Sequence, residues 1–176
     1  MADCINALKE WTVKARATII YDSTVDEFTY DGLFNNVKWK PNVALIGFTT
    51  DGDVFGVFYG VAATKRDKDF NDPNLFVFSF ESHGRCETPR MFPVKKRLKK
   101  NARVMFFTED RYERFVWFGV YGEGCSYLGN ESSKLYCNNV SNVFEELEDT
   151  TLTGRSGKCG YGPYHHFTRL VAVQLS

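Results

Sequence analysis

The chain has 176 residues, and its 22 lysines and arginines equal its 22 aspartates and glutamates in number. A net charge of zero argues against a protein dedicated to long stretches of nucleic acid or to anionic membranes, although a local charged patch is compatible with it. A chain of this length fits one domain that buries about 70% of its unfolded surface. We therefore expect a single domain over residues 1–176, with an N-terminal helix in residues 1–14 and the body in residues 15–176.

The cysteines and the apolar pattern bear on the compartment. Five cysteines are an odd number, and they are spread widely along a chain large enough to hold its own core, which is typical of reduced thiols in the cytosol or nucleus. Charged residues interrupt the first apolar residues, so no secretory signal is expected. No apolar run approaches the length of a membrane span. We expect a cytoplasmic or nuclear protein without a transmembrane segment.

Two short helices and one strand are predicted in the first forty residues. Asp3 is expected to cap a helix whose apolar positions recur at three-residue steps, namely Ile5, Leu8 and Trp11. This helix either packs onto the body of the domain or is the end of a longer helix. An apolar strand is expected at residues 17–21, and Thr29 is expected to cap a second helix. The inward residues of the second helix are Leu33, Phe34 and Val37.

Residues 42–64 are predicted to form a central hairpin. Two apolar runs meet at Asp51-Gly52, a dipeptide suited to the tightest hairpin turns. A two-residue loop there pairs Phe48 with Phe55. Because neither face of this hairpin is polar, we expect it to be covered on both sides near the middle of the fold. The register also places three glycines on one face, where they leave a hollow for bulky side chains: Gly47, Gly56 and Gly60.

The rest of the chain adds strands more than helices. Apolar runs predict strands at residues 75–80, 102–107, 115–120 and 169–175. Residues 81–101 are expected to form a long connection, and Ser141 to cap a short acidic helix with Val143, Phe144 and Leu147 turned inward. This mixture has neither a regular strand–helix alternation nor a strand-only pattern, so it predicts the α+β class. We expect two packed, mostly antiparallel sheets, a β-sandwich core, with short helices on the outside.

A basic segment is the first candidate interaction site. It places six cations within nine residues: Lys95, Lys96, Arg97, Lys99, Lys100 and Arg103. Such a run can bind phosphates with an affinity that falls steeply with salt. It can also bind a protein partner, or be a solvated loop without a ligand.

The other reactive side chains give weaker patterns. Cys86 stands between Arg85 and Glu87, shortly after His83, in a loop expected to be exposed, which makes it the best redox candidate; an ordinary surface thiol is the alternative. Cys159, His165 and His166 lack the paired spacing of a structural zinc site, so neither a metal nor another cofactor is expected. No nucleophile elbow and no acid–base carboxylate pair stands out, and we expect no catalytic residues.

Several motifs, taken in order, resemble the TLDc domain family, particularly its divergent protist members. The similarity covers residues 10–175. The matching segments are EWT to IIYDS (10–23), DEFTYDGLF (26–34), NVALIGFTTDGDVFGVF (42–58), DPNLFVFSF (72–80), FGVYGEGCSYLGN (118–130) and CNNVSNVFEELEDTTLTG (137–154). The chain departs from the family pattern in a sparser glycine segment and in residues 154–166, which resemble an insertion.

The resemblance implies a two-sheet sandwich flanked by helices and a link to oxidative-stress resistance. Several TLDc proteins bind the vacuolar proton pump and regulate its assembly, and the family has no agreed catalytic residues. We therefore expect a non-catalytic protein-interaction domain whose partners include subunits of that pump. The alternatives are a nucleic-acid-binding regulator that uses the basic segment at 95–103, and a peroxide sensor or enzyme built on Cys86.

Overall fold

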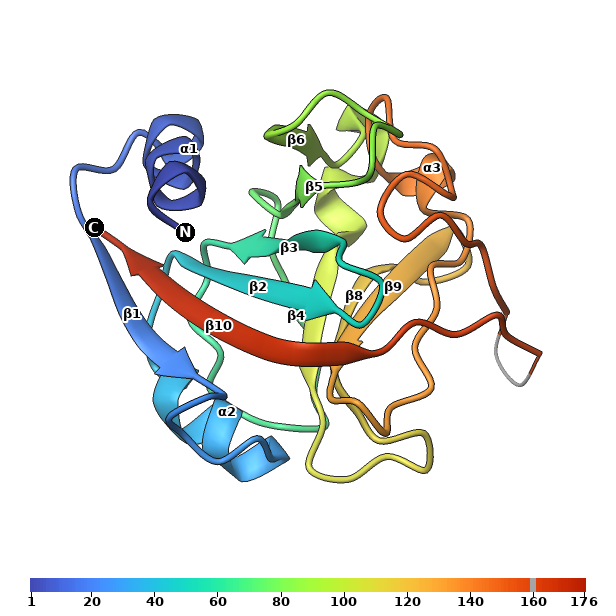
Figure 1. Cartoon of the computed structure of the whole chain (residues 1–176). Coiled ribbons are helices and arrows are strands. Elements are labelled where there is room, and N and C mark those ends of the chain that lie inside the picture. Colours follow the sequence, from blue (N-terminus) through green and yellow to red (C-terminus); the bar gives the residue numbers. More distant parts are fainter. Residues whose placement is uncertain (159–160) are drawn as a thin grey trace.

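The computed structural model describes residues 1–158 and 161–176, and its two antiparallel sheets confirm the predicted α+β sandwich (Figure 1). The helices are α1 (Ala2–Thr12), α2 (Tyr30–Val37), the 3₁₀ helix η1 (Lys96–Asn101) and α3 (Val140–Val143). The strands are β1 (Ala17–Asp22), β2 (Val43–Thr49), β3 (Val54–Tyr59), β4 (Phe70–Asn71), β5 (Phe76–Glu81), β6 (Arg90–Pro93), β7 (Arg103–Phe106), β8 (Arg114–Val120), β9 (Gly124–Gly129) and β10 (Phe167–Leu175). None of the described helices is long and apolar enough to cross a bilayer.

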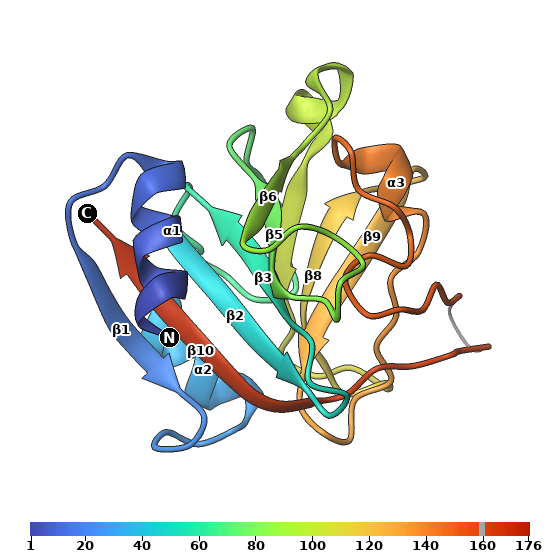
Figure 2. The same ribbon diagram turned by 45° about the horizontal axis from the view of Figure 1, so that its top comes forward.

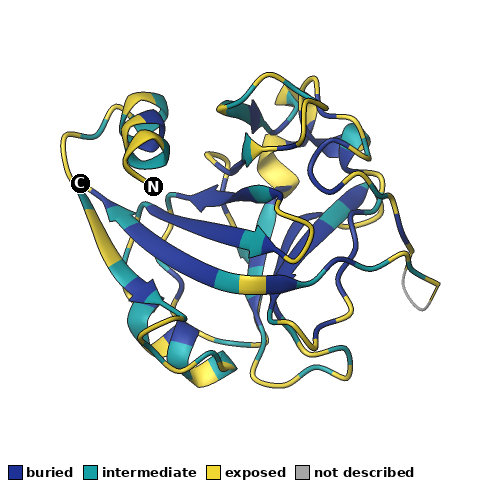
Figure 3. Cartoon of the chain, viewed as in Figure 1, coloured by how far each residue is buried: buried dark blue, intermediate teal, exposed yellow. Residues whose placement is uncertain are grey.

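The larger sheet has the order β1-β10-β2-β3-β5-β6, and the smaller has the order β4-β7-β8-β9. The predicted hairpin, β2–β3, therefore lies in the middle of the larger sheet. The last strand, β10, is an interior strand between β1 and β2. Strands β2, β3 and β10 are buried along most of their length (Figure 3). Burial on both faces explains why these runs are apolar throughout rather than alternating.

Different elements cover the two faces of the hairpin. Leu45 and Val57 face the smaller sheet and share a core cluster with Val104 and Phe118. The opposite face packs against α1, which lies over β2 and β10 (Figure 2). The expectation of a hairpin covered on both sides is thus confirmed.

The predicted hairpin register is wrong by one residue. The loop has three residues, 50–52, and Thr49 faces Asp53: its N–H donates to the Asp53 carbonyl at 2.9 Å, and its hydroxyl accepts from the Asp53 N–H at 2.9 Å. Gly52 adopts φ 88°, the left-handed conformation that a three-residue hairpin loop needs. Phe48 therefore pairs with Val54, and Gly47 with Phe55.

The one-residue shift places Gly47 and Gly56 on opposite faces of the hairpin, because Gly47 now pairs with Phe55 and neighbouring residues of a strand point to opposite faces. The ring of Phe167 packs over Gly47, where an added Cβ would lie 2.1 Å from a ring carbon. The ring of Phe78 packs over Gly56, where an added Cβ would lie 2.7 Å from that ring. Bulky side chains fill the space above Gly47 and Gly56, as predicted, but they do so on opposite faces of the hairpin and not in one shared hollow.

The N-terminal helix packs onto the larger sheet, which confirms the expectation that it packs onto the body of the domain. Leu8 is fully buried, and Trp11 stacks on Phe80 with ring centroids 5.7 Å apart. The predicted cap is wrong: Met1 is the N-cap residue, and Asp3 lies in the first turn, where a carboxylate favours the helix dipole. In α2 the predicted cap is confirmed, since the Thr29 hydroxyl accepts the Gly32 N–H at 3.0 Å.

The acidic helix is much shorter than predicted. Only Val140–Val143 is helical, and Ser141 is not its cap. The Val143 carbonyl accepts the Lys95 N–H at 2.9 Å, and the Glu145 N–H donates to the Pro93 carbonyl at 2.8 Å. These two backbone groups therefore bond to the segment after β6 and to β6 instead of continuing the helix. The predicted inward residues are nevertheless buried: Val143, Phe144 and Leu147.

The connection predicted at residues 81–101 contains two elements that the sequence pattern missed. Strand β6 extends the larger sheet through pairs such as Met91 with Phe78, and η1 follows directly. A four-residue strand that ends in proline carries too little alternation to be detected. These two elements bring the basic segment to the open edge of the larger sheet.

Candidate functional site

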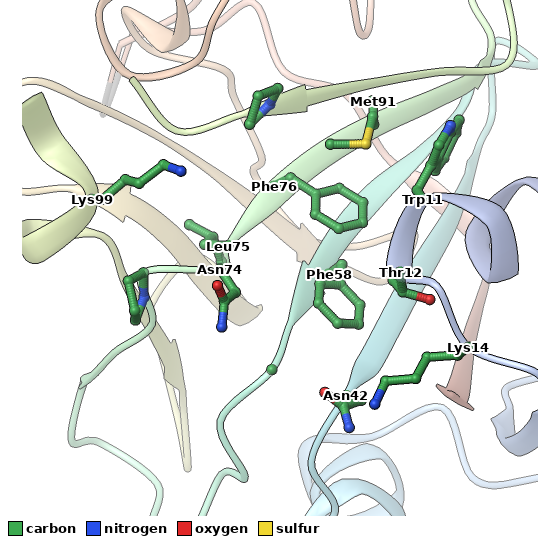
Figure 4. A pocket seen from close by; sticks show the side chains of 13 residues that line it. Trp11, Thr12, Lys14, Asn42, Phe58, Asn74, Leu75, Phe76, Met91 and Lys99 are labelled. Carbon is green, nitrogen blue, oxygen red and sulfur yellow. The ribbon is translucent and has the colours of Figure 1, made fainter. Parts of the chain in front are cut away.

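A groove of about 420 Å³ opens between α1 and the segment that carries β6 and η1 (Figure 4). Phe58 of β3 and Phe76 of β5 stack at its floor with ring centroids 4.8 Å apart, and Trp11 of α1 meets Phe76 edge-on at 6.3 Å. Lys14, just after α1, and Lys99 of η1 lie toward opposite sides of this floor. The groove therefore offers an apolar contact between two cations.

The basic segment does not behave as one charged run, because the fold uses half of its cations. The Lys95 ammonium donates to the Ser141 carbonyl at 2.7 Å. Arg97 forms an ion pair with Glu123 at 3.3 Å, and Arg103 forms one with Asp69 at 2.9 Å. These three side chains have structural partners.

The remaining three cations lie on η1. Leu98 anchors this helix in the core, and Lys96, Lys99 and Lys100 are exposed around it. Within residues 1–158 and 161–176, these three lysines form no ion pair. Lys99 also lines the groove, whereas Lys96 and Lys100 do not. The candidate interaction site thus narrows from six residues to these three and the adjoining groove.

A second polar cluster lies at the tip of the β2–β3 hairpin. The Asp53 carboxylate, only 2% exposed, accepts from Arg85 at 2.5 Å and contacts His83 Nδ1 at 2.9 Å. Arg85 also donates to the Thr151 carbonyl at 2.9 Å. Together, Asp53, His83 and Arg85 form what we call the tip cluster. It joins the hairpin to two loops that are distant in sequence.

The loop that carries the redox candidate Cys86 is exposed, as predicted, at His83, Gly84, Arg85 and Glu87. The Cys86 side chain itself is half-buried against the core, with its sulfur 3.3 Å from the Ser82 hydroxyl. The neighbouring Arg85 directs its guanidinium to Asp53, so that cation serves the tip cluster. A more deeply buried thiol, Cys137, has its pKa raised to about 12 by burial, which keeps it protonated.

Comparison with protein families now gives the decisive observation: the model of the TLDc domain matches residues 3–158. The chain belongs to the TLDc family. The matched part includes both sheets except β10, and it ends within the loop at residues 154–166 that the motif comparison treats as an insertion. No curated protein matched the chain.

The histidines of this TLDc domain do not gather around a ligand. His165 is buried between the rings of Phe55 and Phe167, at 5.6 and 5.4 Å, and its Nε2 has no hydrogen-bond partner. Burial lowers the pKa of His165 to about 3, so the imidazole is neutral. Cys159, the third residue of that weak pattern, lies outside the described residues. The described residues contain no group of three or more potential metal ligands.

The sequence alone did not predict the groove or the tip cluster, because each is formed by segments that are distant in the chain. The groove is lined from α1, the segments around β3 and β5, β6 and η1, which no local motif unites. Asp53 directly follows Asp51-Gly52 in the predicted hairpin turn, and this acidic side chain is the one signal in the sequence that points to the tip cluster. The sequence did not show that Arg85 and His83, about thirty positions away, would be its partners.

Proposed function

We propose that this TLDc domain is a non-catalytic protein-interaction module, acting in oxidative-stress protection or in regulation of the vacuolar proton pump. The observation that carries the proposal is the groove beside η1, with its apolar floor and its lysines, which form no ion pair within the described part of the chain. Exposed apolar surface next to unpaired charge is typical of a surface that is completed by a partner.

The reactive side chains support the same conclusion. Catalysis by a cysteine needs a thiolate-stabilising neighbour, and the guanidinium next to Cys86 is bound to Asp53 instead. His83 Nδ1 contacts the Asp53 carboxylate at 2.9 Å and the Cys86 sulfur contacts the Ser82 hydroxyl, which gives no support to a nucleophile–base pair of His83 and Cys86.

Affinity capture from native lysate, followed by mass spectrometry, tests the proposal. We expect wild-type protein to retain a stable partner, and pump subunits if the second role applies. The variant Lys96→Glu/Lys99→Glu/Lys100→Glu should lose that partner. The variant Lys65→Glu/Lys68→Glu, a charge reversal at exposed lysines of another loop, should keep it. Retention of no partner, or of the same partner by both variants, would contradict the proposal.

A nucleic-acid-binding role is the second candidate, because Lys96, Lys99 and Lys100 are exposed together on one short helix. Stacking support is weak: Phe92 and Phe106, which flank the segment, are each 1% exposed and belong to the core. This role predicts retention on DNA or RNA that weakens with salt. Equal retention by wild type and by the triple glutamate variant would exclude it.

A further inference from the structure

The groove has a rim of one charge sign. Lys14 and Lys99 belong to its lining, which contains no aspartate or glutamate. Neither lysine forms an ion pair with a residue in the described part of the chain. Figure 4 shows them on two sides of the floor formed by Phe58 and Phe76. This arrangement is complementary to carboxylates placed on both sides of an apolar contact.

The floor is suited to apolar anchors. Trp11 and Met91 are half-buried and flank the stacked Phe58 and Phe76. Methionine adapts its shape to different apolar partners. Because a cavity of about 150 Å³ holds one benzene ring, a groove of about 420 Å³ has room for two apolar side chains.

The groove also offers groups that can bond to a peptide backbone. The carboxamides of Asn42 and Asn74 line it near Gly60, and each side chain supplies both donors and an acceptor. An apolar floor with a few convergent polar groups is the usual composition of a binding site for a specific ligand.

We propose that this groove binds a short acidic protein segment in which two apolar side chains are flanked by carboxylates. The inference rests on the proposed interaction function and adds the chemistry of the partner. The apolar side chains contact the half-buried Trp11 and Met91 above the floor formed by Phe58 and Phe76, and the carboxylates pair with Lys14 and Lys99. The amides of Asn42 and Asn74 bond to the backbone of the segment.

The rim favours a protein segment over a nucleic acid. Phosphate is best recognised by arginine forks and by several cations together, whereas this lining has two lysines and no arginine. Bases stack on exposed ring faces. Phe58 and Phe76 stack on each other instead, and each is only 5% exposed.

Selection from a random-peptide phage library against the full chain tests the proposal. We expect the enriched peptides to carry net negative charge and paired aromatic or aliphatic residues. A labelled peptide from this set should bind the variant Lys14→Glu/Lys99→Glu about tenfold more weakly or worse than wild type. The matched control Lys65→Glu/Lys68→Glu makes the same charge change at two exposed lysines that do not line the groove, and its affinity should stay within about threefold of wild type.

A third variant tests the groove itself. A Cβ added at Gly60 would come no closer than 3.7 Å to Asn42 or Asn74, so Gly60→Leu fills the groove without displacing the backbone. Gly60→Leu should abolish peptide binding and leave the unfolding temperature close to that of wild type. Peptides that are basic or uncharged would overturn the proposal. Equal affinities in the two charge-reversed variants, competition by an oligonucleotide in place of the peptide, or no Gly60→Leu-sensitive peptide would each do so too.

Two failures can be told apart. If Gly60→Leu still captures the native partner from lysate, the interaction function stands and the groove assignment is wrong. If the library yields a groove-dependent acidic peptide but no native partner is captured, the groove assignment stands and the proposed cellular function is wrong.

Discussion

The η1 lysines and the tip cluster use similar side chains in opposite ways. At the tip, the guanidinium of Arg85 and the imidazole of His83 converge on Asp53, which is 2% exposed. On η1, Lys96, Lys99 and Lys100 surround the buried anchor Leu98 and have no carboxylate beside them in the described structure. The difference is whether a buried counter-charge lies within reach.

This contrast separates stability from recognition. A cation paired with a buried carboxylate is part of the fold, because removing either member leaves the other unpaired in a poorly solvated place. A cation that ends in solvent contributes little to folding and is available to a partner. Substitutions in the two regions should therefore have effects of different kinds.

The largest effect on stability is expected from Asp53→Asn. The change leaves the guanidinium of Arg85 without its counter-charge. Since Arg85 keeps 27% of its side-chain exposure, we expect a loss near the lower end for a broken buried pair, about 3 kcal/mol in the free energy of unfolding. Denaturant titration measures it.

Asp51→Asn is the matched control for Asp53→Asn. Asp51 lies two residues earlier in the same turn and pairs with Arg155 at 2.6 Å, but its side chain is 43% exposed. A solvated pair of this kind is worth about 1 kcal/mol or less. Equal losses for the two asparagine variants would break the distinction between the buried and the exposed pair.

The next effect is on acid stability and concerns His165. Its pKa is lowered to about 3 in the folded protein by burial, whereas it is ordinary in the unfolded chain. The unfolded state therefore takes up the proton first, and the stability contributed by the neutral imidazole is complete above pH 6.5 and is lost as the pH falls toward 3. His165→Phe, which keeps a ring between Phe55 and Phe167, should flatten this part of the stability curve.

His83→Gln serves as the comparison for His165→Phe, because His83 is 54% exposed in the tip cluster. Below about pH 4 a further loss is expected in all variants, since the hydrogen bond from Arg169 lowers the pKa of Asp22 to about 2. If His165→Phe and wild type lose stability in parallel between pH 6.5 and 4, the role assigned to the buried imidazole is wrong.

The smallest effect is expected from Cys86→Ser. Half-buried beside Ser82, Cys86 has no cation directed at its sulfur within the described contacts, so peroxide consumption should be equal in wild type and variant. A peroxide assay with purified protein, with Cys125→Ser as a second half-buried thiol variant, measures this. A loss of peroxide consumption confined to Cys86→Ser would show that Cys86 reacts with peroxide and would contradict this prediction.

The sequence predicted the architecture better than the site. Apolar runs without a polar face correctly placed β2–β3 in the middle of a sandwich, because a strand that is buried on both faces carries apolar residues on both. The register failed by one residue because a turn containing Asp51-Gly52 also fits a three-residue loop closed by Thr49. The basic segment is evident in the sequence, but which of its six cations have partners depends on Glu123, Asp69 and Ser141, which only the folded chain brings there.

Hydrogen–deuterium exchange on the domain with its captured partner bound tests the central claim most directly, because it maps protection along the whole chain. We predict slower exchange in residues 11–14, 73–76 and 96–101 when the partner binds, and unchanged exchange in residues 51–53 and 82–86. Protection at the hairpin tip with none around η1 would contradict the assignment of the groove and its lysines as the docking surface.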